Sequence, residues 1–140
     1  MNFDTRYLYI ILGLIVIMNL FSGSFDILGV LLTLPGVLVA ITFHEYAHAL
    51  AAYKLGDDTP KVQGRLNLNP LTHLDPIAVV LLVFTHIGWG KPVEINPNNF
   101  DRKISARAGE AIVAAAGPIM NILLAFVIAI IFYALQVFAT

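Results

Sequence analysis

The 140-residue sequence contains no cysteine. Disulfide bridges, thiolate metal sites and cysteine nucleophiles are therefore excluded, and any metal must be bound by His, Asp, Glu, Asn or water. Charge is also scarce, because only 12% of the residues are charged and the formal net charge is −1. A nucleic-acid partner is not expected, since phosphate binding needs a basic surplus.

Apolar residues take the place of the missing charges. They make up 59% of the chain, and the mean hydropathy is +0.82. A soluble domain is typically about 45–50% apolar and about 25% charged. A single core of this size cannot hide so many apolar residues, so lipid is the expected solvent for much of the chain.

Three apolar runs approach or exceed the roughly 20 residues that a membrane-spanning helix needs. They cover residues 7–21, 27–53 and 105–139. For the first run a cleaved signal peptide is the alternative, although its small-residue cleavage pattern is poor. Within the second run, Pro35-Gly36 predicts a kink, or a short segment followed by the main helix. Gly56 suits a helix C-terminal cap.

The distribution of basic residues favours one topology. Arg6 precedes the first run, the connector 22–26 has no Lys or Arg, and the stretch 54–107 holds seven of the eight basic residues. The N-terminus and that stretch are therefore expected in the cytoplasm. The apolar run 77–87 is too short to span, and both of its flanks then lie on one side, so it predicts a re-entrant segment.

The predicted fold is an all-α polytopic protein of the cell membrane, forming a single domain over residues 1–140. It has about three transmembrane helices and one re-entrant segment. Residues 57–75 are predicted as an irregular loop, and residues 92–96 are a candidate strand that leaves room for a short strand pair.

Residues 44–48 read His-Glu-Tyr-Ala-His. On a helix, residues four apart share a face, so His44 and His48 can reach one zinc ion, which prefers nitrogen ligands in tetrahedral geometry. Zinc lowers the pKa of bound water from 15.7 to about 7. Glu45 can then act as general base and pass the proton to a leaving amine.

The alternative is that these polar residues are merely hydrated at the membrane end of the helix. A charged residue inside a membrane helix costs about 2.5–3.5 kcal/mol. That cost favours a functional role for His44, Glu45 and His48.

A catalytic zinc site needs a third protein ligand. Asp75 is the predicted one, with capping or turning of the chain as its alternative role. His73 and His86 are rival ligands. Glu110 qualifies if its helix packs against His48, although its charge also suits a helix N-terminus.

Asn121 lies in the last apolar run and must find a polar partner there. It is predicted to hydrogen-bond the substrate backbone or to hold a water-filled cavity. A helix-packing hydrogen bond, worth about 0.6 kcal/mol on average, is the alternative.

The chain resembles the site-2 protease family of intramembrane zinc metalloproteases, and most of all its short prokaryotic branch. The resemblance rests on ordered blocks at residues 44–48, 64–76, 88–93, 96–100 and 116–121. It implies a multi-pass endopeptidase that cuts transmembrane segments of membrane proteins, with His44 and His48 as Zn²⁺ ligands and Glu45 as base.

One departure bears on the metal site. The family generally takes its third ligand from an Asp in a Leu-Asp-Gly segment after a further helix, and this sequence reaches Thr140 without one. Either the chain is truncated, or Asp75, with or without His73, takes that role, or the site is incomplete.

The competing functions are a non-catalytic membrane protein that binds metal or transmembrane partners, and an ion transporter. A transporter is disfavoured because only Asn121 offers a second polar group on another helix of the ion pathway.

Overall fold

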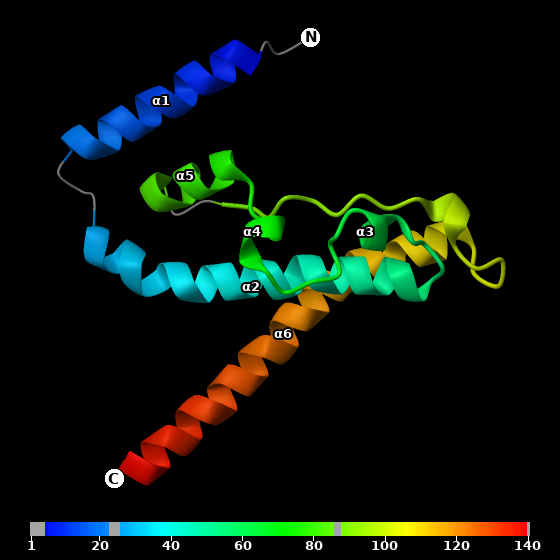
Figure 1. Ribbon diagram of the computed structural model, residues 1–140. Helices are drawn as coiled ribbons and strands as arrows, with labels where there is room; N and C mark the ends of the chain where they lie inside the picture. The colour runs from blue at the N-terminus through cyan, green and yellow to red at the C-terminus, as the bar shows by residue number, and fades with distance from the viewer. Residues whose placement is uncertain (1–4, 23–25, 86–87, 140) are drawn as a thin grey trace.

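The structure, a computed structural model, describes residues 5–22, 26–85 and 88–139. The described chain is mostly helical (Figure 1). Two long helices, α2 (Ile27–Lys54) and α6 (Ala106–Ala139), pack on each other, while α1 (Thr5–Phe21) packs on α5. The short elements between α2 and α6 are α3 (Thr59–Val62), α4 (Pro70–His73), α5 (Pro76–Thr85) and the 3-10 turn η1 (Pro97–Asn99).

Helix α2 is one continuous helix. The Asp26 side chain caps its first turn by accepting a 2.9 Å hydrogen bond from the Gly29 amide. Pro35 lies inside the helix, and Figure 1 shows a bend near the N-terminal end. The predicted separate short segment is therefore wrong, because residues 27–54 form one helix with Pro35 inside it. Gly56 follows the helix with a φ of 102°, which glycine adopts readily, so the predicted C-terminal glycine is confirmed.

Small residues let α2 and α6 approach closely. Ala49 and Ala52 of α2 are fully buried. The buried residues of α6 are Gly109, Val113 and Gly117, which recur every four positions and so form one stripe along the helix. Such stripes allow close helix packing in lipid.

Two of the three predicted spans are long and apolar enough to cross a membrane, namely α2 and α6. None of the most apolar window of α6, and only 11% of that of α2, is buried within the chain, which argues against the core helices of a soluble domain. The described part of the first run, Tyr9–Phe21, is apolar but shorter. The C-terminal part of α6 projects away from the other elements (Figure 1).

Residues 57–75 are more ordered than the predicted irregular loop. They contain α3 and α4, each of which begins with proline in its first turn. Asn69 caps α4 by accepting a 3.1 Å hydrogen bond from the Leu71 amide. Three of the turn-forming residues that suggested a loop, Pro60, Asn69 and Pro70, here start or cap these short helices.

Asp57 ties the end of α2 to the segment before α6. Its buried carboxylate accepts hydrogen bonds from Thr59 Oγ1 at 2.6 Å, the Asn96 amide at 2.7 Å and Asn99 Nδ2 at 2.9 Å. Burial alone would raise the pKa of Asp57, but hydrogen bonds from Thr59, Asn96 and Asn99 outweigh it and lower the pKa below its usual value. The side chain is therefore a buried anion that organises the surrounding loops.

The chain segments before and after α5 are joined to each other. Leu74 and Gly90 form an antiparallel β-bridge, and the Lys91 amide donates a 2.7 Å hydrogen bond to the His73 carbonyl. The two flanks of α5 therefore meet, as a re-entrant segment requires. The predicted strand pair is wrong for the described residues: the bridge is isolated and residues 92–96 form no strand. Pro92 has no amide hydrogen to donate to a ladder.

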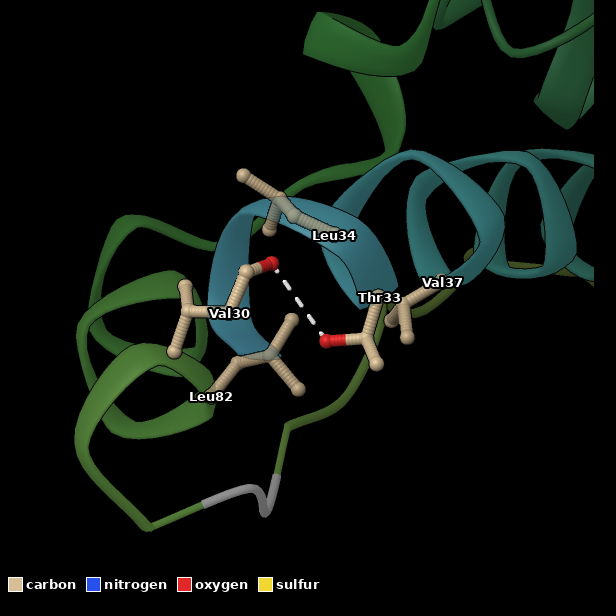
Figure 2. A pocket seen from close by; sticks show the side chains of 5 residues that line it. All are labelled: Val30, Thr33, Leu34, Val37 and Leu82. Atoms are coloured by element: carbon tan, nitrogen blue, oxygen red, sulfur yellow. Dashed lines mark hydrogen bonds between the residues drawn. The ribbon is translucent and has the colours of Figure 1, made fainter. Parts of the chain in front are cut away.

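A small pocket of about 170 Å³ lies between α5 and the N-terminal half of α2. Figure 2 shows its lining, which is apolar except for Thr33. The Thr33 hydroxyl donates to backbone carbonyls of its own helix, at Gly29 and Val30. With no titratable side chain, this pocket offers no chemistry, and the functional site lies farther along α2.

Candidate metal centre

His44 and His48 lie on the face of α2 that packs against α6. Their ring centroids are 4.7 Å apart and the rings are nearly perpendicular. A Cβ placed on Gly117 of α6 would lie 2.6 Å from His44 Nε2 and 2.4 Å from His48 Nε2. Both Nε2 atoms therefore converge on one spot against the backbone of α6.

The opposite ring nitrogen of His48 is held by the backbone. His48 Nδ1 lies 2.6 Å from the Val113 carbonyl oxygen. A carbonyl only accepts, so Nδ1 carries the hydrogen and donates it. The lone pair of the neutral ring is then on Nε2, which is the arrangement of a metal-ligating histidine.

His44 is held by Asn121 of α6. Asn121 Nδ2 lies 3.2 Å from His44 Nδ1, and the buried Asn121 Oδ1 has no hydrogen-bond partner among the described residues. A half-turn of the amide exchanges its oxygen and nitrogen and satisfies Oδ1, because His44 Nδ1–H can then donate to it. In that tautomer the lone pair of His44 is on Nε2, the ring nitrogen that lies beside Gly117.

Glu45 is buried beside the two rings, with 8% of its surface exposed. A Cβ on Gly90 would lie 2.5 Å from Glu45 Oε1, so glycine at position 90 leaves room for the carboxylate in this orientation. A cavity of about 630 Å³ borders His44, Glu45 and Asn121, and a second of about 250 Å³ borders Glu45 and His48. Glu45 is thus reachable from both.

Asp75 lies apart from this cluster. Its Oδ1 accepts hydrogen bonds of 2.8 Å from the Ile77 amide and 3.1 Å from the Ala78 amide. This is the capping role given above as the alternative. Over the described ranges, no three His, Cys, Asp or Glu side chains gather as a metal site, so the structure does not bring Asp75 together with the histidines.

The rival ligands have other surroundings. His73 is fully buried, and its Nε2–H donates a 2.7 Å hydrogen bond to the Asn67 carbonyl. His86 lies outside the described residues. Glu110 does belong to a helix that packs against His48, and it lines the smaller cavity with Glu45 and His48. The first turn of α6 has no acidic residue, so Glu110 is not there to pair with the helix dipole.

The paired donors fit zinc in kind. Two neutral imidazoles present Nε2 atoms to one spot, each ring is held at Nδ1, and a carboxylate of general-base type is adjacent. Zinc favours such nitrogen ligands, and held Nδ1 atoms are the usual support.

Reasoning from the residues alone missed Val113 and Gly117 as parts of the site. The signal was their spacing, because Val113, Gly117 and Asn121 are four residues apart on one face of α6.

Two curated proteins are similar to the chain. The first is "Putative zinc metalloprotease YwhC" of Bacillus subtilis (strain 168), 45% identical over 91 residues, which cover 65% of this chain and 40% of the relative. The second is "Putative zinc metalloprotease Rip2" of Mycolicibacterium smegmatis (strain ATCC 700084 / mc(2)155), 32% identical over 101 residues, covering 68% and 37%. The chain thus spans less than half the length of either relative.

No protein-family model matches the chain, and no solved structure matches it either. The two relatives share one description, that of a zinc metalloprotease. Their similarity supports a zinc metalloprotease family.

Proposed function

We propose that the chain is a zinc-dependent endopeptidase of the cell membrane that hydrolyses peptide bonds in or near transmembrane segments of protein substrates. The observation that carries the proposal is the convergence of His44 Nε2 and His48 Nε2 beside the buried Glu45 carboxylate. The exposed apolar surfaces of α2 and α6 support a site that opens within lipid.

His44 and His48 would hold the zinc through Nε2. When bound, zinc supplies a water acidified to a pKa of about 7 and polarises the carbonyl to be attacked. The Glu45 carboxylate would take up a proton as general base and pass it to the leaving amine nitrogen. The hydrogen bonds from Nδ1 keep both imidazoles in the ligating tautomer throughout.

The substrate would enter through the larger cavity. Besides His44 and Glu45, its walls carry Val37, Ala40 and Ile41. Apolar walls with few polar groups suit the side chains of an unwound transmembrane segment. Asn121 borders the same cavity, and with Oδ1 facing His44 its Nδ2 is free to donate to a substrate carbonyl.

Two residues of this chain are candidates for the third zinc ligand. Asp75 would have to leave its cap on α5, whereas Glu110 already lines a cavity with Glu45 and His48. Zinc content of Asp75→Ala and Glu110→Ala decides between them. Loss in one variant identifies the ligand, and retention in both means that another group supplies it.

A non-catalytic metal-binding or partner-binding protein is the second candidate function. One observation favours it: in the parts of the chain that the structure describes, no third His, Cys, Asp or Glu joins the two histidines. Such a protein would need the metal but not the base.

Glu45→Gln distinguishes the two functions. The chain is reconstituted in lipid vesicles with a reporter protein that carries one transmembrane segment. We expect wild type to cleave the reporter, a zinc chelator to stop cleavage, and Glu45→Gln to slow it by at least about 100-fold while zinc content stays unchanged. Equal cleavage by both chains would overturn the protease proposal. Zinc-loaded wild type that binds the reporter without cutting it would favour the second function.

A further inference from the structure

Gly117 is the point of α6 that both imidazoles approach. The three atoms nearest to a Cβ built at this position are His48 Nε2 at 2.4 Å, His44 Nε2 at 2.6 Å and His44 Cε1 at 2.7 Å. All three belong to the paired rings, and none belongs to the backbone of α2. A side chain at position 117 would therefore first enter the space between the paired rings.

The backbone gives no reason for glycine here. Gly117 lies inside α6 and is not among the described glycines with positive φ, which are Gly56 and Gly64. In a helix interior alanine is the better residue, because glycine loses more backbone freedom on folding. The absence of a Cβ at this position is therefore explained by the space in front of it.

That space matches a metal ion in scale. Zinc lies about 2.0–2.1 Å from an imidazole nitrogen, and the built Cβ is only a few tenths of an ångström farther from each Nε2. A methyl group and a zinc ion cannot both occupy the region between the two Nε2 atoms.

We propose that Gly117 is a positioning residue that keeps this region clear, so that zinc binding requires position 117 to lack a side chain. The proposal rests on the proposed zinc site and adds a requirement from α6 to it. Three residues of one α6 face then act together: Val113 and Asn121 hold the Nδ1 atoms, and Gly117 leaves room at Nε2.

The Gly117→Ala variant should fold. Its methyl group would meet the far ends of two side chains that can rotate, rather than backbone. The rings can swing aside, but this breaks the contacts of His48 with the Val113 carbonyl and of His44 with Asn121. The predicted damage is therefore confined to metal binding.

The test compares zinc affinity by chelator competition, and the absorption spectrum of the Co²⁺-loaded chain, in purified wild type, Gly117→Ala, Gly36→Ala and Gly109→Ala. Gly36 is the open control, since a Cβ there meets nothing within 4 Å. Gly109 is the packing control, since a Cβ there would lie 2.4 Å from the Phe100 ring. Circular dichroism and thermal unfolding report on the fold of each variant.

We expect Gly117→Ala to weaken zinc binding by at least about 100-fold, the upper end of the range for residues that support ligands, and to lose the Co²⁺ spectrum at unchanged helicity. Gly36→Ala should bind as wild type does, and Gly109→Ala should lower the melting temperature yet bind zinc. Wild-type affinity in Gly117→Ala, or equal loss in Gly109→Ala, would overturn the role of Gly117 alone. Wild type that binds neither metal would overturn the proposed zinc site, and this inference with it.

Discussion

The orientation of two imidazole rings decides whether this chain can bind zinc. Each ring has its Nδ1 atom engaged: His48 Nδ1 contacts the Val113 carbonyl at 2.6 Å, and His44 Nδ1 contacts Asn121 at 3.2 Å. Fixing Nδ1 fixes the tautomer, and the two Nε2 atoms then converge beside Gly117. The two supports differ in kind, because one is backbone and the other is a side chain that can be replaced.

Replacing Asn121 tests the tautomer argument. Asn121→Ala removes the acceptor for His44 Nδ1–H, and we expect zinc affinity to fall by about 10–100-fold. Asn121→Asp should keep most of the affinity, because a carboxylate also accepts that hydrogen bond. Chelator competition on the two variants measures both effects. Equal affinity in Asn121→Ala and wild type would show that Asn121 does not orient His44.

At the residue scale, the sequence predicts a site at His44, Glu45 and His48 and singles out Asn121, but it does not show that Val113 and Asn121 contact the two histidines. The spacing of His44, Glu45 and His48 on one helix is a local property, so the pattern alone predicts that they share a site. Val113 and Asn121 come from another helix, 65 and 77 positions along the chain from their partners. Only the packing of α6 on α2 brings them there, and a single sequence does not specify that packing.

Among the elements, the junction between α2 and the segment before α6 depends on Asp57. Its carboxylate is fully buried and accepts hydrogen bonds from Thr59, Asn96 and Asn99. We expect Asp57→Asn to lower the free energy of unfolding by about 2–3 kcal/mol, since hydrogen bonds to a charged group are among the stronger ones. Thermal unfolding in detergent measures the loss.

The same carboxylate gives a pH dependence with a defined sign. The pKa of Asp57 is lower in the folded chain than in the unfolded chain. Its contribution to stability is therefore complete above the ordinary aspartate pKa of about 3.9 and is lost as the pH falls through the lowered value. The difference in melting temperature between wild type and Asp57→Asn should shrink in acid. Asp58→Asn is the control, because Asp58 makes no capping hydrogen bond; an equal effect there would contradict this account.

Element boundaries followed from the sequence where a single residue type decides them. Gly56 marked the end of α2. The apolar run 77–87 was correctly predicted to be shorter than the long helices. The strand predicted at 92–96 is absent, and the irregular loop predicted at 57–75 contains two short helices, for one shared reason. Whether proline and asparagine cap a helix or break a strand depends on neighbours that the tertiary fold supplies, such as the His73 carbonyl that pairs with Lys91.

For the whole molecule, the missing cysteines make the predicted topology directly testable. Ser22 and Asn98 are both exposed, and replacing either with a single cysteine leaves the charge pattern unchanged. If the stretch 54–107 faces the cytoplasm, an impermeant maleimide should label Ser22→Cys in intact cells and Asn98→Cys only after permeabilisation. Labelling of Asn98→Cys in intact cells would invert the topology.

Composition predicted long apolar helices, and the structure has two that are long and apolar enough to cross a membrane. The number of spans was harder to predict. Helices α2 and α6 meet the length requirement, and the apolar stretch Tyr9–Phe21 is shorter. Whether a helix near the length limit crosses a membrane depends on the helices that pack against it as well as on its own residues. Labelling at Ser22 also reports on whether α1 crosses the bilayer.

The central claim is a zinc site formed by His44 and His48, and zinc content of the purified chain tests it most directly. We predict about one zinc per chain for wild type and for Glu45→Gln, and none for His44→Ala or His48→Ala. Metal-free wild type, or undiminished zinc in both histidine variants, would contradict the account.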